Sequence, residues 1–164
     1  MCEYAEMDIA TFRASGSITV SASPEEVYGF ISDMTRMGEI SPECTGGTWE
    51  SESRGVGAIF IGSNTAGDHT WQRRIRIAVA NPPREFAFEN LGDAAVPASA
   101  DDKPIARWGY TFTPLDGGTK VDETWELLDH PLLETLGEER MRSRQATNQD
   151  GINQTLAKLK SLLN

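Results

Sequence analysis

The segment 138–163, at the C-terminal end of the chain, limits most strongly how the sequence can fold. Its large apolar residues recur at helical spacing along one stripe, namely Met141, Ile152, Leu156, Leu159 and Leu163. At about 1.5 Å per residue, an α-helix over this segment would be roughly 39 Å long, enough to cross a small domain. The rest of the chain must therefore pack along one long amphipathic helix.

Two positions of this stripe, Gln145 and Asn148, are polar, and both lie in its N-terminal half. Two interpretations stay open. Either this half of the helix passes over a ligand cavity, or the two side chains mark where the helix extends into solvent. The apolar C-terminal half is predicted to face the core.

The N-terminal part of the chain predicts a strand followed by short helices. Residues 12–20 alternate between apolar or small side chains and polar ones, as in a half-buried strand. Ser23 is the expected N-cap of a helix, Pro24 occupies its first position, and acidic residues follow in the first turn. A second short helical turn is predicted over residues 35–40.

The middle of the chain is strand-like throughout. Turn-forming pairs such as Asn81-Pro82 and Asp116-Gly117 separate the alternating segments. Short connections between consecutive strands favour an antiparallel meander. A short helix is predicted after residue 129, and Gly137 separates it from the long helix. The predicted strands cover residues 44–52, 58–63, 69–81, 84–91, 105–114 and 120–128.

These elements predict an α+β fold with a single domain over residues 12–164 and a flexible lead-in over residues 1–11. A seven-stranded curved antiparallel sheet would wrap around the long helix, because only that helix is long enough to cover the apolar face of the sheet. A space would remain between the two. Residues 92–104 form the longest predicted loop, and whether it gates that space stays open.

Composition excludes several classes of function. The 164 residues carry a net charge of −10, which argues against nucleic-acid binding and against docking on an anionic membrane. No apolar run approaches the roughly 20 residues that span a bilayer, and no signal peptide is visible, so we expect a cytoplasmic protein. The two histidines and two cysteines lack metal-ligand spacing, so we expect no metal and no cofactor.

Strand alternation places two charged residues inward. On the strand 69–81, Trp71 and Arg73 share a face with Ile75, whereas Arg74 and Arg76 should face solvent. A buried Arg73 needs an acceptor from the protein or a ligand, unless its head reaches the sheet rim. On the last strand, Val121, Glu123, Trp125 and Leu127 share the inward face. Glu123 could pair with Arg73, exchange a proton with a ligand, or be a structural buried carboxylate.

Aromatic residues gather on the same predicted face. They are Phe86 and Phe88 on one strand, and Trp108, Tyr110 and Phe112 on the next. Such residues more often form core than a ligand site. Several of them around a cavity would nevertheless suit a ring-bearing ligand.

Three stretches resemble a known superfamily. They are Ala-Ser-Pro-Glu-Glu-Val-Tyr-Gly-Phe-Ile-Ser-Asp from Ala22, Phe-Thr-Pro-Leu-Asp-Gly-Gly-Thr-Lys-Val from Phe112, and Gly-Ile-Asn-Gln-Thr-Leu-Ala-Lys-Leu-Lys from Gly151. Together with the element order, they resemble the START/Bet v 1-like (SRPBCC) superfamily and, within it, the polyketide cyclase/dehydrase and lipid-transport group. The resemblance covers residues 12–163. It implies a helix-grip fold with a cavity for a hydrophobic small molecule, in a superfamily of lipid carriers, hormone sensors, co-chaperones and aromatase/cyclases.

The first hypothesis is therefore a carrier or sensor of a hydrophobic small molecule such as a lipid or polyketide. The alternatives are a polyketide aromatase/cyclase-type enzyme, with Glu123, Arg73 and Tyr110 as catalytic candidates, and a co-chaperone or protein-partner module. A monomer and a homodimer are equally open. The predicted ligand-binding residues are Trp71, Arg73, Phe86, Phe88, Trp108, Tyr110, Glu123, Trp125, Gln145 and Asn148.

Overall fold

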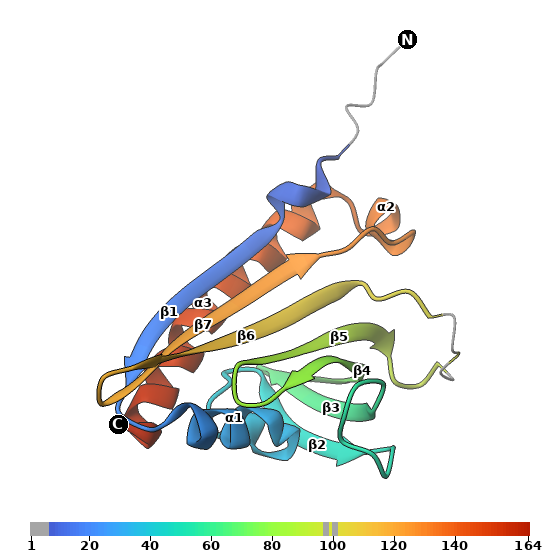
Figure 1. Cartoon of the computed structure of the whole chain (residues 1–164). Helices are drawn as coiled ribbons and strands as arrows, with labels where there is room; N and C mark the ends of the chain where they lie inside the picture. Colours follow the sequence, from blue (N-terminus) through green and yellow to red (C-terminus); the bar gives the residue numbers. More distant parts are fainter. Residues whose placement is uncertain (1–6, 97–98, 100–101) are drawn as a thin grey trace.

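The computed structural model describes residues 7–96, 99 and 102–164. Within these ranges, one sheet and one long helix dominate the fold (Figure 1). In chain order the elements are η1 (Ile9–Thr11), β1 (Arg13–Val20), α1 (Pro24–Ser32), η2 (Met34–Glu39), β2 (Cys44–Trp49), β3 (Ile59–Ala66), β4 (His69–Asn81), β5 (Glu85–Asp93), β6 (Ala106–Leu115), β7 (Gly118–Leu127), α2 (Leu132–Leu136) and α3 (Glu138–Leu163).

The seven strands form one antiparallel sheet in the order β1-β7-β6-β5-β4-β3-β2. This order confirms the predicted meander from β2 to β7. Strand β1 pairs with β7 and forms one edge of the sheet. Strand ends differ from the prediction by a few residues. For example, β2 ends at Trp49, because the N–H groups of Glu50 and Ser51 both donate to the Ile59 carbonyl in a turn, at 2.9 and 3.3 Å.

Helix α3 packs closely against β1, at the edge of the sheet. A Cβ on Gly16 of β1 would lie only 2.8 Å from Cγ2 of Ile152, so the glycine permits this close approach. Two glutamines of α3 then bind the free backbone groups of the β1 edge. Gln145 Nε2 donates to the carbonyls of Thr11 and Arg13, both at 2.8 Å. Gln149 Nε2 donates to the Ser15 carbonyl at 2.7 Å, and Gln149 Oε1 accepts from the Ser15 N–H at 3.2 Å.

The short helices close the two ends of the space between sheet and helix. In Figure 1, α1 lies near the C-terminal end of α3, and α2 lies near its N-terminal end. Helix α1 begins with a capping box, in which Ser23 and Glu26 each accept a hydrogen bond from the backbone N–H of the other, at 3.2 Å. On the same helix, Tyr28 meets the rings of Phe86 and Phe112 edge-on. The N-terminus of α1 is thus at the position that Ser23 and Pro24 predict.

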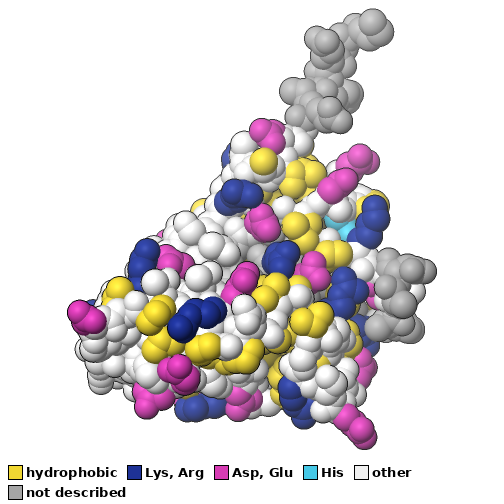
Figure 2. Space-filling view, in the orientation of Figure 1, with side chains coloured by type: hydrophobic (Ala, Val, Ile, Leu, Met, Phe, Trp, Pro, Cys, Tyr) yellow, Lys and Arg dark blue, Asp and Glu magenta, His cyan; other side chains and the backbone are white. Residues whose placement is uncertain are grey.

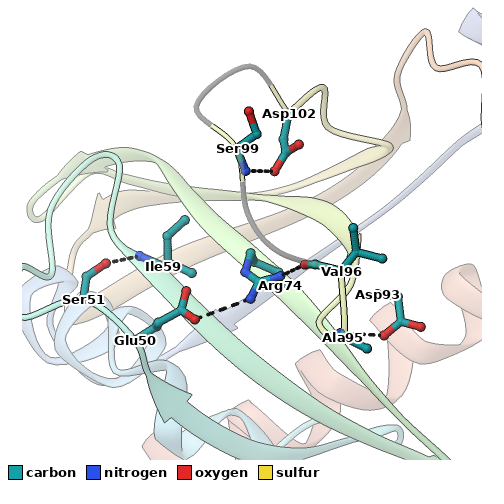
Figure 3. Close-up of polar contacts among 9 residues, drawn as sticks. All are labelled: Glu50, Ser51, Ile59, Arg74, Asp93, Ala95, Val96, Ser99 and Asp102. Atoms are coloured by element: carbon teal, nitrogen blue, oxygen red, sulfur yellow. Dashed lines mark hydrogen bonds and ion pairs between the residues drawn. The ribbon is translucent and has the colours of Figure 1, made fainter.

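The face of β4 that carries Arg74 and Arg76 differs from the prediction, which placed both side chains in solvent. Arg74, expected in solvent, is only 8% exposed. Figure 3 shows its guanidinium between two acceptors: one Nη donates to the Val96 carbonyl, and the other lies 3.4 Å from Glu50 Oε1. Directly after β5 the chain stays beside β4, where the Ala94 N–H donates to the Gln72 carbonyl and Val96 contacts Arg74. Arg76 is partly buried beside Glu89. A register shift between Ile77 and residue 79 also interrupts the alternation further along β4.

Two further expectations concern the lead-in and the longest loop. Within the expected flexible lead-in, residues 9–11 form the 3-10 helix η1, and residues 1–6 lie outside the described residues. The expected loop 92–104 begins later, because Gly92 and Asp93 still belong to β5. Residues 97–98 and 100–101 of that loop lie outside the described residues, so the question of whether the loop gates the space beside α3 stays open. In the described part of the chain, no helix is long and apolar enough to cross a membrane.

Candidate functional site

A cavity of about 650 Å³ lies between the concave face of the sheet and the N-terminal half of α3. Its size falls within the range of roughly 300–1,000 Å³ that is common for small-molecule sites. The cavity exists because α3 leans on the β1 edge and leaves the middle strands uncovered at this end. Leu132, Leu133 and Leu136 of α2 line the cavity from one side, and Met34 and Met37 of η2 line it from another.

An aromatic row forms one wall. Phe88 of β5 pairs with Trp108 of β6, which pairs with Trp125 of β7. The ring of Trp108 lies 6.5 Å from that of Phe88 and 6.4 Å from that of Trp125. The register of three adjacent strands therefore makes a continuous aromatic surface, and Trp71 of β4 lines the same cavity. Such a surface is suited to a flat or ring-bearing molecule.

A buried acid lies two residue pairs further along β6 and β7, on the same face. Glu123 of β7 pairs with Tyr110 of β6, and the Tyr110 hydroxyl donates to Glu123 Oε1 at 2.8 Å. Glu123 is only 2% exposed, and its other oxygen, Oε2, has no hydrogen-bond partner among the described residues. Burial raises the pKa of Glu123 to about 8, although the Tyr110 hydrogen bond opposes this rise. Burial, together with the Glu123 carboxyl, raises the pKa of Tyr110 well above its ordinary value.

Arginines gather at the mouth of the cavity. Arg73 of β4 and two residues of α3, Arg140 and Arg144, all line it. Arg144 Nη1 lies 3.0 and 3.1 Å from the two carboxylate oxygens of Glu43. Arg73 donates to a backbone carbonyl at 3.3 Å, and burial lowers its pKa, with Arg144 adding to this effect. Glu43 and Asp150 also line the cavity, so the mouth combines three arginines with two carboxylates in a chain whose net charge is −10. Elsewhere, on the described face seen in Figure 2, acidic and basic side chains are interspersed.

Eight of the ten predicted ligand-binding residues line this one cavity. They are Trp71, Arg73, Phe88, Trp108, Tyr110, Glu123, Trp125 and Asn148. Whether they bind a ligand stays a prediction, but the structure brings them together. The suggested pairing of Arg73 with Glu123 is not what the structure shows, because Glu123 bonds to Tyr110 and Arg73 bonds to a backbone carbonyl.

Phe86 and Gln145 lie elsewhere. Phe86 is 1% exposed and packs between Tyr28 and Phe88 in the core, because α1 covers this end of the sheet. Gln145 faces the β1 edge, where its amide serves the strand backbone. Asn148 lies three residues further along α3 and does reach the cavity, where its Oδ1 accepts from Arg144 at 3.4 Å.

Several lining residues were missed from the sequence. Cys44 lies at the start of β2, and burial raises the pKa of its thiol. Its position follows from the pairing of β2 at the far edge of the sheet, which no local pattern reveals. Arg140 and Arg144 carry a signal that was available, since their four-residue spacing places both on the helix face that contains Asn148. Among the described residues, no group of three or more His, Cys, Asp or Glu side chains could hold a metal ion.

Comparison with known families decides the wider relationship. The family model described as polyketide cyclase/dehydrase and lipid transport matches residues 11–163. The chain belongs to this family. The Polyketide_cyc-like protein Cgl2372 of Corynebacterium glutamicum has a structure solved by NMR in solution. It is 31% identical in sequence to this chain, and the two structures have a TM-score of 0.62. The similarity covers 93% of this chain and 91% of the other. No curated protein matches the chain in sequence.

More distant structures share only the fold with this polyketide cyclase/dehydrase family member. The di-domain ARO/CYC StfQ from the steffimycin biosynthetic pathway has a TM-score of 0.68 at 14% identity, over 93% of this chain and 50% of that one. Ara h 8.0201 has a TM-score of 0.60 at 12% identity, over 91% of this chain and 97% of that one. The sheet and long helix thus form the helix-grip fold of Bet v 1-like proteins, as predicted.

Proposed function

We propose that this protein is a carrier or sensor of a hydrophobic small molecule, such as a lipid or polyketide, held in the cavity between the sheet and α3. The observation that supports this most is the cavity itself, about 650 Å³ in volume, with an aromatic wall and a buried acid. At about 30 Å³ for a water-sized group, it has room for roughly 20 non-hydrogen atoms.

The arrangement of charges suggests how such a molecule would lie. The apolar body would contact Phe88, Trp108 and Trp125, because burial of apolar surface is the main favourable term in binding. A polar or acidic end would lie at the mouth beside Arg73, whose guanidinium faces the cavity without a carboxylate in hydrogen-bond contact among the described residues. This orientation keeps the charged group near solvent and the rings in the interior.

The proposal is tested by identifying what the protein carries. Native mass spectrometry of protein purified from its own source, followed by denaturation and small-molecule identification, should reveal a bound lipid or polyketide. Gly62 lines the cavity, and a Cβ at this position would lie 3.8 Å or more from its neighbours, without a clash. Gly62→Leu should therefore fill part of the cavity and abolish retention of the bound molecule. Gly55→Leu is the matched control, since no atom lies within 4 Å of a Cβ at that exposed position.

A second pair of variants tests the mouth. Arg73→Ala should weaken the retention of an acidic ligand, whereas Arg13→Ala should not, because Arg13 is exposed on β1 and pairs with Glu126 outside the cavity. An empty wild-type protein that shows no thermal shift with a panel of lipids and aromatic polyketides would contradict the proposal. Equal retention by the Gly62→Leu variant would also contradict it.

A second candidate function is proton-transfer catalysis of the aromatase/cyclase type. The pair of Glu123 and Tyr110 favours it, because a cavity carboxyl with a pKa of about 8 exchanges protons effectively near neutral pH. The test is the exchange of the methyl protons of 2-acetylnaphthalene in D₂O, followed by NMR. Wild-type protein should accelerate this exchange relative to Glu123→Gln. Equal rates would contradict catalysis and leave binding as the function.

A further inference from the structure

Building on the proposed function, we propose that Glu123 is a carboxylic acid whose Oε2–H donates a hydrogen bond to the ligand. The ligand is then a molecule with a neutral carbonyl group on its buried part, such as a ketone or an ester, rather than a plain hydrocarbon chain. This inference rests on ligand binding in the cavity, and it adds the chemical group that the cavity recognises.

The geometry at Glu123 identifies the atom that carries the proton. Tyr110 donates its only hydroxyl hydrogen to Glu123 Oε1, at 2.8 Å. Oε1 therefore acts as the acceptor, which leaves Oε2 as the oxygen that bears the proton. Oε2 has no partner among the described residues, and Glu123 lies in the cavity wall. Burying a polar atom without a partner is unfavourable, so a ligand group that pairs with Oε2 gains affinity from doing so.

The surroundings of Glu123 favour its neutral form. On β1 its partner is Gly16, which has no side chain, and on β6 its partner is Tyr110. Where α3 lines the cavity near its apolar half, it contributes the uncharged Asn148 and Thr155. No described cation forms an ion pair with Glu123; the ion pairs of the described residues all lie elsewhere. Burial without a counter-ion penalises the carboxylate and favours the acid.

The other ionisable groups of the cavity lie at its mouth or stay neutral. The charged ones are Arg73 of β4, Glu43 after η2, and three residues of α3, Arg140, Arg144 and Asp150. Cys44 of β2 and Tyr110 both have a raised pKa because of burial, so each keeps its proton to higher pH. A loss of carbonyl binding between neutral and mildly alkaline pH therefore reports on Glu123.

The experiment compares two probes of similar shape, 2-acetylnaphthalene and 2-ethylnaphthalene, by isothermal titration calorimetry. At about pH 6, wild-type protein should bind the ketone about 5- to 10-fold more tightly, which is the effect of one added hydrogen bond. At about pH 9.5 the preference should disappear, because the carboxylate has no proton to donate and repels the carbonyl oxygen. The affinity for the hydrocarbon should change little.

Two variants separate donation from packing. Glu123→Gln should keep the ketone preference at both pH values, because its carboxamide N–H donates and does not titrate. Glu123→Leu should lose the preference at both. Should the leucine variant fail to fold, the wild-type pH series and the glutamine variant still decide the question.

The outcomes distinguish the two proposals. If wild-type protein binds neither probe, the proposed function is contradicted. If it binds both probes equally at about pH 6, the cavity proposal stands and the acid donor is contradicted. A ketone preference that persists unchanged at about pH 9.5 in the wild type would also contradict the role of Glu123, because another donor would then be responsible.

Discussion

The buried acid predicts an unusual dependence of stability on pH. The pKa of Glu123 is about 8 in the folded protein, against an ordinary value of 4.5. Between these values the folded state holds a proton that the unfolded state has released. The free energy of unfolding therefore falls as the pH rises from about 4.5 to about 8. Below about pH 4.5 Glu123 is protonated in both states and does not change the free energy of unfolding. Above about pH 8 it is ionised in both states, and the decrease in the free energy of unfolding is complete.

The magnitude follows from the two pKa values. Each pH unit between 4.5 and about 8 corresponds to about 1.36 kcal/mol, so the whole window of about 3.5 units corresponds to about 5 kcal/mol. This is a large share of the 5–15 kcal/mol that is typical of a folded domain. Glu123→Gln removes the titrating group, keeps an acceptor for the Tyr110 hydroxyl and matches the size of the side chain. Part of this window lies below pH 5, so the advantage of Glu123→Gln over the wild type should grow by about 4 kcal/mol from about pH 5 to about pH 9.

The assay is urea unfolding followed by tryptophan fluorescence at several pH values. The difference between the wild type and Glu123→Gln cancels the titration of all other groups. Glu126→Gln is the matched control, because Glu126 lies on the same strand with its side chain outside the cavity, beside Arg13. A difference between the wild type and Glu123→Gln that stays constant from about pH 5 to about pH 9 would refute the reasoning, since Glu123 would then titrate alike in both states.

Three further predictions concern the packing of the helices and can be checked by urea unfolding. Gln149→Ala should lower the free energy of unfolding by about 1 kcal/mol, because both hydrogen bonds to Ser15 are lost; an unchanged midpoint would mean that water replaces them fully. Gly16→Val should cost about 1–3 kcal/mol, because its Cβ would lie 2.8 Å from buried Ile152; a neutral effect would show that α3 shifts freely. Ser23→Ala should cost about 1 kcal/mol through loss of the capping box, with Ser23→Gly costing less.

Much of the fold was predictable because its signals are local. The long helix has the predicted bounds, Glu138–Leu163, since the spacing of its apolar residues depends only on the helical repeat. The N-cap at Ser23 and the antiparallel meander follow in the same way from short stretches of sequence. Strand alternation also placed Glu123 and Trp125 on the inner face correctly.

Contacts between distant segments decided the rest. Gln145 and Asn148 lie on the same stripe, yet the first binds the β1 edge and the second reaches the cavity, because Gly16 lets α3 lean to one side. Arg74 is buried in contact with Val96 and Glu50, which are distant in the chain, whereas alternation alone places it in solvent.

The sequence by itself thus determined most elements, their order and, for strands such as β7, the inward face, because those depend on repeats of two or 3.6 residues. Only the tertiary structure decided the site. The pairing of Tyr110 with Glu123 depends on the register between β6 and β7, and the cavity depends on where α3 touches the sheet. Register and helix placement are set by contacts between residues far apart in the chain, and no local pattern contains them.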